Sequence, residues 1–258
     1  MEIIVSLIMS DIIYDCRWST DLDEKFKADF CQVECAVFHN DYSEDHLAHK
    51  FLDNIYGPSV LEVVYIDGKP SAARALWRND ICGREAYQPG DTCVMDNCRG
   101  KGVFTEMTKR SIALLPENAI IYNFPNHLSY PGYMKMGWTL LHEYGIRLFV
   151  STKKYFQEHP VKMDKEYARW WVEESNRISY LKRGNDFFLV KPDRRPFMKH
   201  IVACVDEEIA KAFPKASWGI YFYPSEKNTF YNRRFMKSHV VCRNSDLKYI
   251  PTWKIDAL

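Results

Sequence analysis

The chain has 258 residues, of which 47% are hydrophobic and 15% aromatic, so it can bury a large core in one big domain or two smaller ones. No apolar run approaches the roughly 20 residues that cross a bilayer, and Met1–Ile8 lacks the basic region of a secretory signal. The eight cysteines form neither a Cys-x-x-Cys pair nor a zinc-ligand spacing, so we predict no metal site and expect reduced thiols in the cytoplasm.

The first third of the chain predicts a mixture of helices and strands. Apolar residues at helical spacing indicate helices at Leu22–Phe38 and from Ser43 to Ile55. Runs rich in β-branched and aromatic residues, separated by turn residues, indicate strands. These predicted strands are Ile12–Trp18, Val60–Ile66, Ala72–Trp77 and Glu85–Met95, the last with an interruption at Pro89-Gly90.

A glycine-containing run, Arg99-Gly100-Lys101-Gly102-Val103-Phe104, stands between the end of the strand pattern Thr92–Met95 and a helical pattern over Gly102–Leu115. The first amides of a helix lack intrahelical partners and carry the positive end of the helix dipole, which suits a pyrophosphate. The two glycines let the backbone approach phosphate oxygens and adopt positive φ. An ordinary turn before a helix explains the same residues.

Two other phosphate motifs are excluded by their spacing. The chain has no Gly-x-x-x-x-Gly-Lys-Ser/Thr run, which excludes a P-loop. Position 105 is threonine where a dinucleotide fingerprint requires its third glycine, which excludes a Rossmann turn.

A second group of residues follows about two dozen positions later. Ala119–Tyr122 reads as a short strand, and Asn126 is followed by Ser129 three residues on, Tyr133 seven residues on, and then Gly137-Trp138. The order and spacing of the two groups resemble the GNAT superfamily of acyl-CoA-dependent N-acyltransferases. Two residues depart from that pattern, since Phe104 replaces a small residue and Trp138 replaces a phenylalanine.

The resemblance is best over residues 61 to 148. It implies an α/β (mixed α+β) fold, with a central mixed but mostly antiparallel sheet flanked by helices. It also implies that acetyl-CoA (coenzyme A) is the cosubstrate, held between a splayed fourth strand, Gln88–Met95, and a fifth, Ile120–Asn123. The cofactor-binding residues so implied are Cys93, Val94, Arg99, Gly100, Lys101, Gly102, Val103, Phe104, Asn126 and Ser129.

Acyl transfer to an amine requires a proton acceptor and a proton donor for the leaving thiolate. The resemblance implies that Tyr133 is the acid. Asp91, on the strand edge before the glycine run, is our first choice for the base, with Glu143 and His127 as alternatives. Capping or turn formation explains Asn126 and Ser129 equally well.

The chain continues for more than a hundred residues beyond this core. A helix is predicted at Met163–Ser175, strands at Phe187–Val190, His200–Val205 and Trp218–Tyr223, and a helix at Asp206–Phe213. The similar order of elements suggests a degenerate GNAT-like half without a second cofactor loop, so we predict domains at 1–150 and 151–258. The first carries 14 Lys/Arg against 21 Asp/Glu and the second 21 against 13.

We therefore expect an acyl-CoA-dependent N-acetyltransferase that acts on a small, anionic amine such as an amino sugar or sugar nucleotide. The basic second half favours an anionic acceptor, and neither a membrane nor a nucleic acid is expected as a partner. Two alternatives stay open: an aminoacyl or peptidyl transferase of the same fold, and a noncatalytic CoA-binding module.

Overall fold

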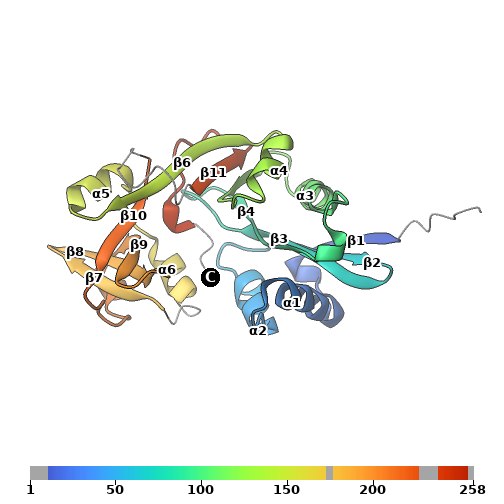
Figure 1. Cartoon of the computed structure of the whole chain (residues 1–258), viewed down its shortest axis with the longest axis horizontal. Coiled ribbons are helices and arrows are strands. Elements are labelled where there is room, and N and C mark those ends of the chain that lie inside the picture. Colours follow the sequence, from blue (N-terminus) through green and yellow to red (C-terminus); the bar gives the residue numbers. More distant parts are fainter. Residues whose placement is uncertain (1–10, 173–176, 227–237, 255–258) are drawn as a thin grey trace, which may run out of the picture. The chain divides into compact units, whose positions relative to one another are not determined.

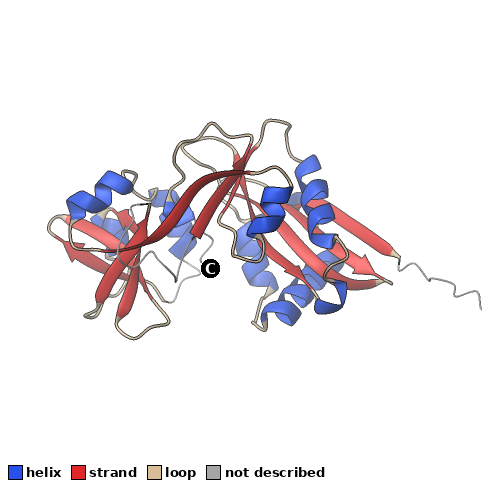
Figure 2. Cartoon of the chain, turned by 45° about the horizontal axis from the view of Figure 1, so that its top comes forward, coloured by secondary structure: helices blue, strands red, loops and turns tan. Residues whose placement is uncertain are grey.

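The computed structural model describes residues 11–172, 177–226 and 238–254. The chain forms two compact units, Met1–Ile121 and Tyr122–Leu258, which we call unit 1 and unit 2. Each unit contains strands flanked by helices (Figures 1 and 2). The apolar start Met1–Ile8 and the end of the helix predicted at Met163–Ser175 lie outside the described residues.

Unit 1 contains the strand order β1-β2-β3-β4-β5, of which β5 crosses the boundary after Ile121. Neighbouring strands are antiparallel, except that β5 runs parallel to β4. The strands are β1 (Ile12–Trp18), β2 (Val60–Ile66), β3 (Lys69–Arg78), β4 (Ala86–Val94) and β5 (Ile120–Asn123), and the α-helices are α1 (Glu24–Phe38), α2 (Glu44–Leu47) and α3 (Val103–Ala113). The predicted mixed, mostly antiparallel sheet is therefore confirmed.

The helices of unit 1 cover opposite faces of its strands (Figure 1). On one face, α3 packs with Val64 and Ala72 through Val103 and Met107. On the other face, the Cys93 thiol of β4 donates a hydrogen bond to Glu34 of α1. Because helices cover both faces, β2 and β3 are buried almost continuously instead of alternating between buried and exposed residues.

Unit 2 contains the strand order β11-β6-β10-β9-β8-β7. Its strands are β6 (Thr139–Leu148), β7 (Ser179–Arg183), β8 (Asp186–Pro192), β9 (Met198–Val205), β10 (Ile220–Ser225) and β11 (Ser238–Arg243). Its α-helices are α4 (Tyr130–Lys135), α5 (Thr152–Glu158), α6 (Lys165–Val172) and α7 (Glu207–Ala210). The strand β6 pairs with β10 and β11, so it belongs to unit 2. The sequence analysis instead predicted a domain boundary after residue 150, which would place β6 in the first domain.

The two units share one strand pattern. In unit 1, β2, β3 and β4 are successive antiparallel neighbours and β4 pairs in parallel with β5. In unit 2, β7, β8 and β9 are successive antiparallel neighbours and β9 pairs in parallel with β10. A bulge lies at equivalent places, where β4 pairs with β3 and where β9 pairs with β8. This pattern supports the suggested GNAT-like repeat.

Several predicted elements differ from the observed ones. The strand β4 continues through Pro89 and Gly90, which pair with β3, and the irregularity falls instead on Asp91 and Thr92. Proline suits extended backbone, and its missing N–H is tolerated beside a bulge. The helix predicted at Asp206–Phe213 is only the single turn α7. The strands β7 and β11 and the helix α5 were not predicted.

Among the described residues, no helix has both the length and the apolar character needed to cross a bilayer. The described part of the chain also contains no group of three or more His, Cys, Asp or Glu side chains that could hold a metal ion.

A buried polar network lies between α3 and the strands of unit 1. Glu62 of β2 and Arg74 of β3 are cross-strand neighbours, and both are fully buried. Ser111 donates a hydrogen bond of 2.6 Å to Glu62 Oε2, and Arg74 donates one to the Thr108 hydroxyl. Burial raises the pKa of Glu62 to about 7, although the Ser111 hydrogen bond and the Arg74 charge act in the opposite direction.

This raised pKa predicts how stability depends on pH. Glu62 holds its proton more tightly in the folded protein than in the unfolded chain. Its contribution to the free energy of unfolding is therefore present at acidic pH and is lost as pH rises through about 7. The free energy of unfolding of the wild type, measured relative to Glu62→Gln in urea, should therefore fall between pH 5 and pH 8. The same comparison with the exposed control Glu117→Gln should show no such trend. If the difference between the wild type and Glu62→Gln does not change with pH, the raised pKa of Glu62 is refuted.

Candidate functional site

The glycine run of unit 1 forms the connection between β4 and α3. Gly100 has φ of 76° and Gly102 has φ of 78°. These are left-handed conformations that other L-residues adopt at a cost of roughly 1–2 kcal/mol. A Cβ atom at either glycine would meet no atom within 4 Å. The glycines are therefore explained by backbone conformation, and the space in front of them is open.

The helix α3 begins directly after Gly102, and no side chain caps this end. The Gly102 carbonyl accepts a hydrogen bond of 3.1 Å from the amide of Glu106, which closes the first helical turn. The amides that precede Glu106 have no acceptor within the helix. Open space, uncapped amides and the helix dipole together make this end suitable for an anion.

Two cations flank this helix start. Arg99 and Lys101 are both exposed. The Arg99 guanidinium contacts Asp96 at 2.8 Å and donates a hydrogen bond of 3.3 Å to the Val94 carbonyl. The Arg99–Asp96 pair is a surface ion pair of the kind that contributes at most about 1 kcal/mol. Arg99 can therefore exchange this partner for a phosphate at small cost.

Phe104, the bulky departure from the family pattern, is half-buried. The Arg74 guanidinium lies 5.1 Å from the centre of its ring. Because Arg74 belongs to β3, the ring packs toward the strands beneath α3. This geometry favours inward packing of the Phe104 ring over crowding of a ligand.

The β4 bulge is held by a buried ion pair. Asp91 has φ of 42°, a strained value for a residue other than glycine. Its carboxylate accepts hydrogen bonds of 2.9 Å from the Lys50 ammonium and 2.7 Å from the Tyr42 hydroxyl. The Lys50 side chain is only 1% exposed and lies 5.0 Å from the Trp77 ring. These contacts compensate for the strained backbone.

The ion pair also determines the proton affinity of Asp91. Burial by itself would raise the pKa of Asp91, but the Lys50 charge and the hydrogen bonds from Lys50 and Tyr42 outweigh it and hold the pKa below the usual value. A carboxylate with a lowered pKa is a weak proton acceptor. The role of Asp91 as general base stays a prediction, and the geometry gives this residue a clear structural role instead.

Beyond the bulge, β4 keeps antiparallel pairing with β3 at Cys93 and Val94. Its parallel pairing with β5 is limited to Ala86 and Tyr87. The Cys93 side chain is buried against Glu34, and burial followed by the Glu34 charge raises the pKa of its thiol. Cys93 is therefore unreactive as a thiolate, and only its backbone can serve a ligand.

The second motif lies in unit 2, at the start of α4. The Asn126 side-chain oxygen accepts hydrogen bonds of 3.0 Å from the amides of Leu128 and Ser129, and one of 3.2 Å from the Ser129 hydroxyl. Both side chains therefore shape the turn into α4. Among the described residues the Asn126 amide NH₂ has no acceptor, so it remains available to a ligand.

Tyr133 is 1% exposed and packs against Trp138, with ring centres 4.7 Å apart. The buried Trp138 Nε1–H has no hydrogen-bond partner among the described residues. A phenylalanine at position 138, as in the family pattern, would not carry this donor. The departure from the pattern thus places an additional N–H beside the predicted acid.

Sequence reasoning missed one residue near the alternative base Glu143. The Glu143 carboxylate lies 3.3 Å from Nε2 of His239, which is on the neighbouring strand β11. The His239 ring stacks on Tyr130 of α4 at 4.0 Å. His127, the other alternative, is exposed. No motif marked His239, because it lies 96 positions after Glu143 in the sequence and only the strand pairing brings them together.

Several solved structures resemble this chain over most of its length. A candidate N-acyltransferase from Enterococcus faecalis V583 has a TM-score of 0.54 at 11% identity, over 90% of this chain and 72% of that one. A candidate acetyltransferase from Pyrococcus horikoshii has a TM-score of 0.52 at 11% identity, over 94% of each chain. A GCN5-related N-acetyltransferase from Kribbella flavida has a TM-score of 0.50 at 12% identity, over 89% and 71%.

The chain has the GNAT fold. No protein-family model matches its sequence, and no curated protein matches it either. At 11% to 12% identity the likeness concerns the backbone, so the roles of individual residues depend on the geometry described above.

The ion pair at the bulge gives a stability prediction. Lys50→Met should lower the free energy of unfolding by about 3–5 kcal/mol, because it leaves the Asp91 carboxylate buried without its counter-charge. The double variant Lys50→Met/Asp91→Asn should recover part of that loss. Urea unfolding at neutral pH measures both variants.

The matched control is Lys211→Met, which removes the same charge from an exposed pair with Glu207 and should change the free energy of unfolding far less than Lys50→Met does, because solvent screens an exposed pair. Equal losses for Lys50→Met and Lys211→Met would contradict the proposed importance of the buried pair.

Proposed function

We propose that the protein is an acyl-CoA-dependent N-acyltransferase that transfers an acetyl group from acetyl-CoA to an amine. The observation that carries this proposal is the uncapped start of α3, opened by Gly100 and Gly102 at positive φ and connected to a bulged strand through the short turn Asp96–Cys98. The GNAT fold supports it independently. No metal is required for this chemistry.

In the proposed complex, the diphosphate of coenzyme A lies on the backbone from Gly100 to Phe104. Arg99 and Lys101 supply positive charge there. The backbone of Cys93 and Val94 at the end of β4 hydrogen-bonds the pantetheine arm. The Asn126 amide NH₂ and the Ser129 hydroxyl are further proposed contacts of the cofactor.

In the proposed reaction the acetyl group passes directly from the thioester to the amine. The amine lone pair attacks the thioester carbonyl, the C–S bond breaks, and the thiolate takes a proton from the Tyr133 hydroxyl while the amine loses one to a base. We propose Asp91 as the residue that positions the bulge through Lys50. The pairing of Glu143 with His239 makes that pair the better supported proton acceptor.

The acceptor is proposed to be a small anionic amine, such as an amino sugar or sugar nucleotide. The net positive charge of residues 151–258 supports an anionic acceptor. All eight cysteines are free, which supports the proposed cytoplasmic location, where thiols stay reduced.

Binding of acetyl-CoA tests the cofactor assignment. At 100 times its Kd, acetyl-CoA should stabilise the protein by about 2.7 kcal/mol, seen as a rise in Tm. Gly102→Ala should raise the Kd for acetyl-CoA at least tenfold, because its Cβ enters the open space in front of the α3 amides.

Gly68→Ala is the matched control for Gly102→Ala. Gly68 has φ of 75° and equally open space around it, so both variants carry the same backbone strain. Only Gly102→Ala should lose affinity. If acetyl-CoA does not shift the Tm, or if both variants bind it equally, the cofactor assignment is wrong.

Removal of the proposed acid tests the mechanism. Tyr133→Phe should lower kcat at least tenfold, by loss of general acid catalysis, and leave the Kd for acetyl-CoA within about twofold. Thiol release during turnover gives kcat, and calorimetry gives Kd. The control Tyr144→Phe removes a hydroxyl from another buried tyrosine of unit 2 and should leave kcat unchanged. An unaltered kcat in Tyr133→Phe excludes the hydroxyl from catalysis.

A further inference from the structure

Two exposed aromatic side chains pack against each other at one end of the strands of unit 2. Phe197 lies in the connection from β8 to β9, and Trp218 lies just before β10. Their ring centres are 5.8 Å apart in an edge-to-face arrangement. Phe197 is 66% exposed, Trp218 is 77% exposed, and Ile220 beside them is 47% exposed. We call these three residues the aromatic patch. Large apolar side chains that gather on a surface mark a contact site, whereas single ones do not.

The aromatic patch is held by a fixed backbone. Phe197 has φ of 62°, a strained value for a residue other than glycine, and its carbonyl accepts a hydrogen bond of 2.7 Å from the Ile220 amide. A Cβ at Gly219 would lie 2.8 Å from the same carbonyl, so glycine lets the two segments approach closely. The Lys199 ammonium donates hydrogen bonds of 2.6 Å and 2.9 Å to the hydroxyl and carbonyl of Ser217. A partner therefore meets rings that are already ordered.

Unpaired cations lie at the same end of the strands. The start of β7, the end of β8 and the starts of β9 and β10 meet there, because β7, β8 and β9 alternate in direction and β9 runs parallel to β10. Arg177 lies two residues before β7, Arg194 lies in the β8–β9 connection, and Lys215 lies three residues before Trp218. All three are exposed, and none of them forms an ion pair within the part of the chain that the structure describes.

Negative charge is nearly absent from the same segments. The sequence has no aspartate or glutamate from 194 to 205 or from 209 to 225. The carboxylate of the β8–β9 connection is Asp193, which is 10% exposed and contacts Arg195 at 2.7 Å and His200 at 2.6 Å. The exposed charge around the aromatic patch is therefore positive, which makes this surface complementary to an anionic one.

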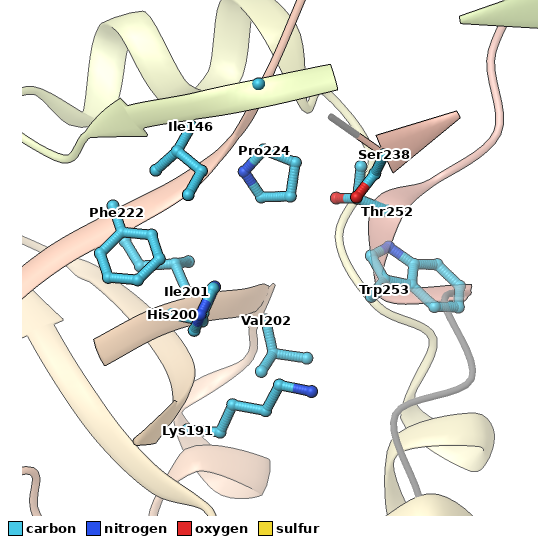
Figure 3. A pocket seen from close by; sticks show the side chains of 11 residues that line it. Ile146, Lys191, His200, Ile201, Val202, Phe222, Pro224, Ser238, Thr252 and Trp253 are labelled. Atoms are coloured by element: carbon cyan, nitrogen blue, oxygen red, sulfur yellow. The ribbon is translucent and has the colours of Figure 1, made fainter. Parts of the chain in front are cut away.

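A cavity of about 290 Å³ lies at the other end of the paired segment of β9 and β10. These strands pair only from Met198 to His200 and from Ile220 to Phe222. Around the cavity, Figure 3 shows residues at or beyond the last of these pairs, among them Ile201, Val202, Phe222 and Pro224. No residue of the aromatic patch lines the cavity. The aromatic patch is therefore separate from the opening at the strand ends.

The combination of rings and cations favours a lipid surface. Tryptophan and phenylalanine rings suit the boundary between headgroups and acyl chains, and lysine and arginine are attracted to anionic lipids. Stable attachment to a bilayer takes two such signals together. Bases of a nucleic acid stack on open ring faces, whereas here the two rings pack edge to face and lie beside the aliphatic Ile220.

We propose that this end of unit 2 binds reversibly to the surface of a bilayer that contains anionic lipids. The rings of Phe197 and Trp218 enter the headgroup region, and Arg177, Arg194 and Lys215 contact the anionic headgroups. The sequence analysis expected no membrane partner, because Phe197 and Trp218 are 21 positions apart in the sequence and only the fold brings them together. This surface does not depend on acyl transfer.

Sedimentation with vesicles tests the proposal on the full chain. Vesicles of phosphatidylcholine with about 30% phosphatidylserine should bind the protein at least tenfold more tightly than vesicles of phosphatidylcholine alone, because only the former attract the cations. Binding should weaken as NaCl rises, since salt screens exposed charges. If the protein does not bind the phosphatidylserine vesicles, or binds the two kinds equally, the proposal is overturned.

Variants of the aromatic patch locate the binding. Phe197→Asn/Trp218→Ser removes both rings, and asparagine tolerates the positive φ of position 197. This double variant should weaken vesicle binding at least tenfold, because the apolar signal is lost. The matched control Phe38→Asn/Leu52→Ser removes two side chains of unit 1 that are 51% and 43% exposed and should bind as the wild type does. Equal binding by both double variants would contradict the proposal.

The cations are tested in the same way. Arg194→Gln/Lys215→Gln should weaken binding to the phosphatidylserine vesicles and reduce its dependence on salt. The control Lys69→Gln/Lys109→Gln removes the same net charge from exposed positions of unit 1 and should have little effect. Equal losses in the two double variants would show that net charge alone, and not this surface, drives the binding.

Other occupants give different results. If a single-stranded oligonucleotide binds more tightly than the vesicles and Phe197→Asn/Trp218→Ser abolishes that binding, the surface serves a nucleic acid and the proposal is overturned. If the wild type forms a dimer in sedimentation velocity that this variant does not form, the occupant is a second copy of the chain, and the proposal is overturned as well.

Acetyl-CoA separates this proposal from the proposed function. Phe197→Asn/Trp218→Ser should leave the Kd for acetyl-CoA unchanged, and a raised Kd would overturn the independence of the two sites. If the wild type does not bind acetyl-CoA, the proposed function fails, and the vesicle results still decide the lipid surface.

Discussion

The buried pair of Lys50 and Asp91 is the constraint on which the geometry of unit 1 depends. It joins the helical segment Ala48–Leu52, which follows α2, to the place where β4 departs from regular pairing, and the Tyr42 hydroxyl joins the segment before α2 to the same place. Two buried charges are expensive to remove from water, and here they are compensated by the Tyr42 hydroxyl and by the Trp77 ring. The strained φ of Asp91 persists because these contacts fix its side chain. The direction in which β4 continues toward the glycine run follows from this bulge.

The two units share one strand pattern and differ in the connection that follows the bulge. Each has a bulged strand with a short parallel pairing that stops before the strand ends. In unit 1 this connection contains Gly100 and Gly102 at positive φ, whereas in unit 2 it contains Glu207 and Glu208, which pair with Lys211 and Arg169. The connecting residues, rather than the strands, are therefore what distinguishes the two units at this place.

Sequence analysis found what is encoded locally. The apolar run Ala119–Tyr122 predicted β5 to within one residue at either end, and the glycine run was placed correctly between strand and helix. Both have local causes, a short apolar run and residues that permit positive φ. The α/β class and the GNAT fold followed from the order and spacing of two such local groups.

Features that depend on distant partners were not accessible from the sequence. Asp91 was interpreted as a base because its partner Lys50 lies 41 residues away, and nothing in the sequence pairs them. The association of Glu143 with His239 has the same cause. The strand β7 has no fully buried residue, and the buried run of β11 is limited to Val240, Val241 and Cys242, so both lack the longer apolar runs by which strands are recognised.

The network beneath α3 connects the stability of unit 1 with its proposed site. An interface made only of Val64, Ala72 and Met107 would allow α3 small shifts along the strands, because apolar contacts have no direction. Hydrogen bonds from Ser111 to Glu62 and from Arg74 to Thr108 have specific geometry and remove that freedom. Since Gly102 directly precedes α3, fixing the helix also fixes the amides that would face the diphosphate. We infer that the buried charges are retained for positional precision, because burial alone would favour an apolar replacement.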